Sequence, residues 1–152
     1  MQAAEKLTDH LGTLNTAQRL AAEYGEAAGD KGFSAGPLLG IVGAGTGKTM
    51  TLAHRVAHLL MNGVDPERIL LLTFTRRAAQ EMTRRVESIV RAATRGSTSA
   101  LLPAGSLPWS GTFHSIANRL LRRFAHNLGL DPGFSVLDRG DAADIMDVVR
   151  HE

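Results

Sequence analysis

A glycine-rich stretch that ends in lysine and threonine is the part of this sequence best suited to chemistry. Glycines at 43, 45 and 47 let the backbone curl with its N–H groups inward, where a Cβ would block a bound anion. Lys48 offers a mobile positive charge to β- and γ-phosphate oxygens, and Thr49 offers a hydroxyl that can ligate Mg²⁺. The stretch therefore predicts a polyphosphate-binding nucleotide site formed by Val42, Gly43, Ala44, Gly45, Thr46, Gly47, Lys48 and Thr49.

Two elements must position this turn. The apolar run from Leu38 to Val42 predicts a buried parallel strand, and a helix is expected from Lys48 to about Asn62-Gly63. The start of such a helix presents free N–H groups and the positive end of its dipole to the same anion. The usual pattern has glycine where Val42 stands, but a valine can end a strand. A flexible connector that happens to precede a lysine is the alternative, and the order of strand, turn and helix argues against it.

A second set of candidate residues lies where another predicted strand, residues 69–74, runs into a helix capped by Thr75. Here Thr73, Phe74, Thr75 and Arg76 place an aromatic ring between hydroxyls and a guanidinium. Such a group suits single-stranded nucleic acid, because the ring can stack on a base while the polar groups hold phosphates. The alternative is that Phe74 is a core residue and the arginines are merely solvated, and the spacing alone leaves both open.

A similar group of a hydroxyl, an aromatic ring and an imidazole lies where a short strand at 110–113 meets a helix expected over 114–128. It consists of Thr112, Phe113 and His114. Nothing near His114 completes a catalytic triad or a set of metal ligands, so a capping or phosphate-contacting role is favoured.

Asp138 follows a possible short strand at 134–137 and resembles an acidic Mg²⁺ ligand. That strand alternates in polarity and no glutamate follows the aspartate, so a helix cap is favoured over a metal role.

Composition limits the class of protein. The chain has 152 residues, of which 43% are apolar and 21% charged, as expected for one folded, soluble domain. No apolar run approaches a membrane span, and no signal peptide is recognisable at the N-terminus. The absence of cysteine excludes disulfides and thiolate metal sites and fits a cytoplasmic location. Six arginines between 76 and 95, against an acidic segment at 131–152, predict a polyanionic partner on one face.

Together these stretches resemble the UvrD/Rep/PcrA-like superfamily 1 DNA helicases, in their N-terminal RecA-like ATP-binding domain. Leu14 to Gln18 is similar to the family's Q motif, which implies that Gln18 reads the adenine of ATP. Residues 42–49 resemble its phosphate loop, and residues 69–82 resemble motif Ia, where the ring of Phe74 would stack on single-stranded DNA. Residues 111–115 resemble motif Ib, which implies that Thr112 and His114 contact the DNA backbone.

The resemblance implies an α/β, P-loop NTPase fold: a RecA-like parallel sheet flanked by helices, here incomplete. We expect a lead-in at 1–11, a partial ATP-binding domain at 12–130 and the start of an inserted helical subdomain at 131–152. The expected function is the ATP·Mg²⁺- and single-stranded-DNA-binding portion of a 3′-to-5′ helicase, with Lys48 as its catalytic residue.

Several parts of such a helicase have no counterpart in this sequence: the Asp-Glu metal motif, the sensor glutamine, the arginine fingers and the second RecA-like domain. We therefore expect the missing C-terminal helicase domains as partners, and negligible ATP hydrolysis by this chain alone. The alternatives are a stand-alone P-loop NTPase or phosphotransferase unrelated to DNA, which needs an acid such as Asp138, and a non-catalytic remnant.

Overall fold

The computed structural model describes residues 9–28, 33–41, 43, 45–94, 107–137 and 139–151. Three positions considered above, Val42, Ala44 and Asp138, lie outside these residues. The chain divides into two compact units, Met1–Phe113 and His114–Glu152. Among the helices of the described ranges, none is both long enough and apolar enough to cross a membrane.

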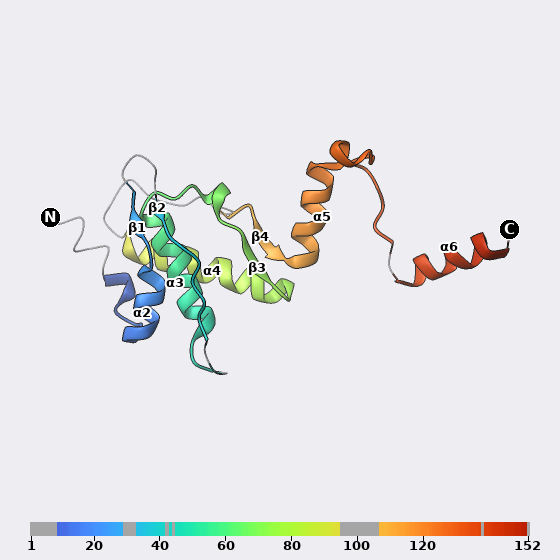
Figure 1. Cartoon of the computed structure of the whole chain (residues 1–152). Coiled ribbons are helices and arrows are strands. Elements are labelled where there is room, and N and C mark those ends of the chain that lie inside the picture. The colour runs from blue at the N-terminus through green and yellow to red at the C-terminus, as the bar shows by residue number, and fades with distance from the viewer. Residues whose placement is uncertain are drawn as a thin grey trace. The chain divides into compact units, whose positions relative to one another are not determined.

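The first unit is built on a central helix with a helix packed on either side. Helix α3 (Lys48–Met61) contacts both α2 (Thr16–Glu23) and α4 (Arg76–Ala93), as Figure 1 shows. The shorter elements of this unit are η1 (Asp9–Leu11), β1 (Glu26–Ala27), β2 (Phe33–Ser34), η3 (Pro66–Arg68), β3 (Leu71–Thr73) and β4 (Ser110–Thr112).

Two small sheets accompany these helices. Strands β3 and β4 pair in parallel, with Leu71 opposite Ser110 and Thr73 opposite Thr112. Strands β1 and β2 form an antiparallel pair, with Glu26 opposite Ser34 and Ala27 opposite Phe33. The α/β class and a small parallel sheet are confirmed, while the full RecA-like sheet is absent from the described residues.

The predicted buried strand before the glycine-rich turn is wrong in the part that the structure describes. Residues 38–41 adopt no strand, and the side chains of Leu39 and Ile41 are 83% and 88% exposed. A buried parallel strand needs hydrogen-bonded neighbours on its edges and helices on both faces. Within the described residues β3 pairs with β4 and no strand lies against residues 38–41, so this apolar run has no ladder to join.

Helix boundaries follow the local capping signals. At α2, Asn15 and Gln18 form a reciprocal capping box, with N–H to side-chain oxygen distances of 2.9 and 3.0 Å. At α4, the Thr75 hydroxyl accepts the Ala78 N–H at 3.1 Å. Helix α3 ends at Met61, and Gly63 follows in the left-handed region with φ of +79°. The helices predicted after the glycine-rich turn and after Thr75 are confirmed.

The core lies where α3, α4 and β3 meet. Its members recur at helical spacing on both helices, and they exclude water from between the two. The buried residues are Ala53, Val56, Ala57, Ile69, Leu71, Met82, Val86, Val90 and Leu107. This packing fixes the start of α3 and the end of β3, which carry the candidate site residues.

The second unit contains most of α5 (Phe113–Arg123), η4 (Ala125–Leu128) and α6 (Arg139–His151). The helix expected over 114–128 thus changes to 3₁₀ geometry at its end, and Gly129 stops it with φ of +68°. The strand expected at 134–137 is wrong. Arg122 donates to the carbonyl oxygens of Pro132 at 2.6 Å and Phe134 at 2.9 Å, which holds this segment in a loop.

Candidate nucleotide site and the neighbouring strand end

The glycine-rich turn is built on two left-handed residues directly before α3. Gly45 has φ of +74° and Gly47 has φ of +82°, a region that favours glycine because a Cβ would clash there. A Cβ on Gly47 would also stand 2.8 Å from Nε2 of Gln18, whereas one on Gly45 would meet open space. Gly43 does not take a positive φ, so among glycines 43, 45 and 47 of this turn, the conformation favours glycine at 45 and 47.

Lys48 folds back over this turn. Its ammonium donates to the carbonyl oxygen of Gly43 at 3.1 Å, and the Thr46 hydroxyl donates to the same oxygen at 2.8 Å. The side chain is exposed, and a phosphate oxygen is a stronger, charge-assisted acceptor than a neutral carbonyl. The lysine is therefore held near the position where an anion on the turn would sit, and it can exchange its partner.

Gln18 reaches the same turn from α2. Its Nε2 donates to the carbonyl oxygen of Thr46 at 2.8 Å, while its Oε1 accepts the Asn15 N–H. The side-chain amide therefore joins the N-terminus of α2 to the glycine-rich turn, 28 residues away in the sequence. The spacing of Asn15 and Gln18 is typical of a capping box, whereas no local pattern indicates the contact with Thr46.

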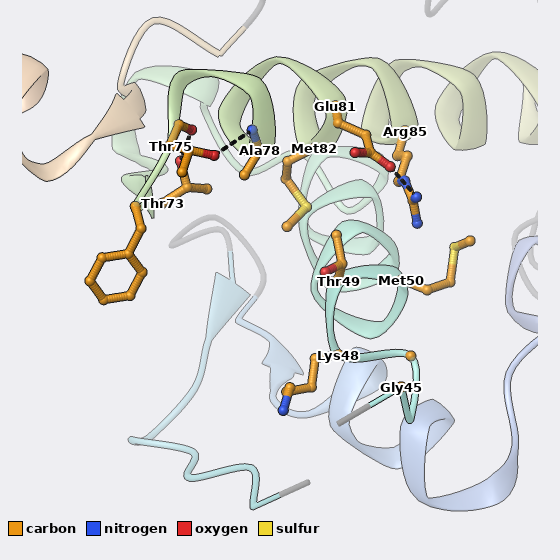
Figure 2. Close-up of a pocket in the computed structure, with 12 residues that line it drawn as sticks. Gly45, Lys48, Thr49, Met50, Thr73, Thr75, Ala78, Glu81, Met82 and Arg85 are labelled. Carbon is orange, nitrogen blue, oxygen red and sulfur yellow. Dashed lines mark hydrogen bonds and ion pairs between the residues drawn. The ribbon is translucent and has the colours of Figure 1, made fainter. Parts of the chain in front are cut away.

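A hollow of about 610 Å³ lies between the start of α3, the end of β3 and the first half of α4. Figure 2 shows Gly45, Lys48 and Thr49 on one side of it and Thr73, Thr75 and Ala78 on the other. The full lining is Gly45, Gly47, Lys48, Thr49, Met50, Thr73, Phe74, Thr75, Ala78, Glu81, Met82 and Arg85. The two predicted sets of site residues thus meet at one hollow.

Glu81 and Arg85 on α4 form an ion pair that lines this hollow, as the dashed line in Figure 2 shows. Sequence reasoning did not place them in the site. Their spacing of four residues, N-terminal acid first, was the available signal, since such pairs lie together on one helix face.

The aromatic side chains at the strand ends lie beside each other. Phe74 is 90% exposed, so the alternative in which it is a core residue is wrong. Its ring centroid is 5.5 Å from that of Phe113, which is 48% exposed, and the two planes are tilted by 49°. A ring with this exposure offers its face to a planar ligand.

The hydroxyls around these rings have structural partners. Thr73 Oγ1 donates to the carbonyl oxygens of Thr75 at 3.1 Å and Gly111 at 3.4 Å, which ties β3 to β4, and the Thr75 hydroxyl caps α4. Arg76 is exposed as the first residue of α4. Thr112 ends β4, and His114 is an exposed residue of α5 in the second unit. Contacts of these residues with DNA stay a prediction.

Within the described ranges, there is no group of three or more histidine, aspartate or glutamate side chains that could hold a metal ion.

Comparison with known proteins places the chain in a family. Residues 23–152 match the family model of the UvrD/REP helicase N-terminal domain. The chain is 43% identical over 112 residues to the ATP-dependent DNA helicase PcrA of Bacillus subtilis (strain 168), a match that covers 73% of this chain and 14% of that protein. It is 41% identical over 119 residues to PcrA of Staphylococcus epidermidis (strain RP62A), covering 77% of this chain and 15% of that protein. The chain belongs to the UvrD/REP helicase family and is similar to the N-terminal region of PcrA.

Proposed function

We propose that this chain is the ATP-binding and single-stranded-DNA-binding portion of a PcrA-type helicase. The observation that carries the proposal is the shared hollow, because Lys48 and Thr49 of the glycine-rich turn and Phe74, directly after β3, line it together. A nucleotide on the turn and a DNA strand at the exposed ring would then act on the same small group of elements.

ATP would bind with its phosphates on residues 43–49. Lys48 would leave the carbonyl of Gly43 and neutralise the γ-phosphate, while the positive end of the α3 dipole would act on the same anion. The Thr49 hydroxyl would supply one ligand to Mg²⁺. The open space around Gly45 and the left-handed backbone of Gly45 and Gly47 fit a bound anion.

Gln18 would read the adenine. Its amide already contacts the carbonyl oxygen of Thr46, so a base that engages this side chain would also act on the turn that holds the phosphates. The same contact would make the turn sensitive to any displacement of α2.

A single DNA strand would stack a base on Phe74, with Phe113 next to it. Arg76 would attract the phosphates, and Thr112 and His114 would contact the backbone. The bonds that Thr73 and Thr75 already make within the protein suggest that these two residues mainly hold the ring-bearing strand end in place.

Hydrolysis and movement along DNA are proposed only for a longer protein, because the chain spans 14–15% of the relatives described above. In such a protein ATP would close a second domain onto this one, and the direction of stepping that we propose is 3′ to 5′. The 152-residue chain alone would bind ATP and turn it over negligibly, since phosphoryl transfer needs charge stabilisation beyond one lysine.

Binding of ATP·Mg²⁺ to the chain and to the Lys48→Ala variant tests the nucleotide site. We expect the variant to lose about tenfold or more in affinity, because it removes the only cation that lines the hollow from the turn itself. Arg139→Ala, an exposed change on α6, is the control and should bind like the parent chain. Equal affinity of the Lys48→Ala variant and the parent would show that the turn does not bind phosphate.

A further inference from the structure

Three histidines pack together on the side of α3 that faces η1. The ring of His10 in η1 stacks on His54 with centroids 6.2 Å apart and on His58 with centroids 5.9 Å apart, each pair tilted by 22°. His10 and His54 are buried, with 9% and 4% of their surface exposed. We refer to these three residues as the imidazole cluster. In the described part of the chain, Nδ1 of His54 and Nδ1 of His58 are buried without a hydrogen-bond partner.

The surroundings of the cluster do not favour a positive charge. Phe33 of β2 meets His58 edge-on at 6.0 Å, and the guanidinium of Arg55 lies 5.3 Å from the ring of Phe33. Among the described groups, the carboxylate that acts on His58 is Glu23, which is already paired with Arg19 at 3.3 Å.

Helix α4 also contacts η1. The charged residues in the second half of α4 are Arg84, Arg85, Glu87 and Arg91, whereas the groups that shift the pKa of His54 and His58, besides burial, are His10, Arg55 and Glu23. A proton taken up by the cluster would therefore be poorly compensated.

Burial lowers the pKa of His54, the charge of His10 lowers it further, and the backbone of His10 acts in the opposite direction. Burial also lowers the pKa of His58, with Arg55 adding to the effect and Glu23 opposing it. In the unfolded chain a histidine has a pKa of about 6.5. The unfolded chain therefore binds more protons as the pH falls below about 6.5, and the stability contributed by the neutral imidazoles is lost in that range.

The cluster is connected to the glycine-rich turn by a short run of residues. Leu11 of η1 is 1% exposed, its carbonyl accepts the Leu14 N–H at 3.0 Å, and Thr13 Oγ1 lies 3.5 Å from His54 Nε2. Asn15 then opens the capping box with Gln18, whose amide holds Thr46. Displacement of η1 would thus be passed through Thr13 and Asn15 to Gln18.

We propose that the imidazole cluster is a pH-sensitive latch, which holds η1 and the start of α2 against α3 and releases them when the imidazoles take up protons. Release moves Gln18 away from the turn and weakens nucleotide binding. This second step rests on the nucleotide site proposed above, whereas the latch itself does not.

The test uses the full chain with His54 and His58 both replaced by Phe, which keeps an aromatic ring at each position and removes the ionisation. The control is His126→Phe, an exposed histidine in η4. ATP·Mg²⁺ affinity and urea unfolding are measured at about pH 7.5 and about pH 5.5, on either side of the pKa of a free imidazole. We expect the parent chain and the control to lose about tenfold in affinity, together with stability, as the pH falls. The double variant should lose about threefold or less, the part due to protonation of the nucleotide itself.

Equal losses of stability in the parent and the double variant would overturn the latch. A pH-dependent stability in the parent with unchanged ATP affinity would overturn its coupling to the turn. Failure to bind ATP at either pH would reject the proposed nucleotide site, while the urea measurement would still decide the latch. If the double variant does not fold, proton NMR titration of the imidazoles in the parent replaces it. Two buried imidazoles with pKa values at or above about 6.5 would then overturn the latch.

Discussion

Gly47 meets two requirements at one position, and this makes it the most sharply constrained residue of the candidate site. Its φ of +82° is unfavourable for any residue with a Cβ, and that atom would stand 2.8 Å from Gln18 Nε2. Gly63, with φ of +79°, shares the backbone requirement but has no neighbour within 4 Å of such a Cβ.

The pair offers a matched comparison. Gly47→Ala and Gly63→Ala should each destabilise the chain by about 1–2 kcal/mol, because both force alanine into the left-handed region. Only Gly47→Ala should also weaken ATP·Mg²⁺ binding, by about tenfold, since the new methyl displaces Gln18 from the turn. Urea unfolding and nucleotide titration measure the two effects, and undiminished ATP binding by Gly47→Ala would contradict the role of Gln18.

Phe74 is 90% exposed, so a substitution there can change ligand binding without changing the stability of the fold. Phe74→Ala should cost about 1–3 kcal/mol of single-stranded oligonucleotide binding if the ring stacks on a base. It should leave the free energy of unfolding nearly unchanged, because little apolar surface is uncovered. Leu39→Ala, at a residue 83% exposed and outside the hollow, is the control. Oligonucleotide binding that is equal in Phe74→Ala and the control would remove the ring from the proposed DNA site.

At the scale of the elements, α4 connects the hollow to the core. Its first turn is fixed by Thr75, whose hydroxyl accepts the Ala78 N–H, and its buried face packs on α3 through Met82, Val86 and Val90. The strand end that carries Phe74 therefore has little freedom to move without disturbing the helix.

Thr75→Ala should destabilise the chain by about 1 kcal/mol, because it leaves the capped N–H of α4 without its partner. Thr75→Ser keeps the hydroxyl and should restore most of that stability. Urea unfolding measures the stability of the two variants. Equal stability of the Ala and Ser variants would mean that the cap contributes nothing, and that the hydroxyl is available for another role.

At the scale of the whole molecule, charge is unevenly distributed along the chain. Arginines concentrate on α4, whereas aspartates concentrate in α6, and the formal net charge is only +2. Attraction to a polyanion must therefore come from a local basic face rather than from the overall charge.

Single-stranded oligonucleotide binding by the purified chain should weaken steadily as salt rises, since each phosphate neutralised by arginine releases a counterion. ATP turnover should stay negligible with or without the oligonucleotide. Salt-independent or absent binding at low salt would favour an NTPase unrelated to DNA. Turnover stimulated by the oligonucleotide would show that the chain is catalytically complete.

The features that the sequence determined by itself are local. The capping box of Asn15 and Gln18, the Thr75 cap, the apolar spacing of α3 and α4 and the glycine-lysine-threonine turn all rest on contacts within a few residues. Because hydrogen bonds and side-chain faces in a helix repeat every three to four residues, such patterns can be read without knowing the rest of the fold.

Tertiary structure alone decided what depends on distant neighbours. The run at 38–41 has the composition of a buried strand, yet it forms none in the described residues, because ladder hydrogen bonds need a partner that no local pattern supplies. The exposure of Phe74, the bond from Gln18 to Thr46 and the stacking of His10 on α3 likewise join residues far apart in the chain or depend on what covers them. Their physical basis is packing between elements, which sequence spacing does not encode.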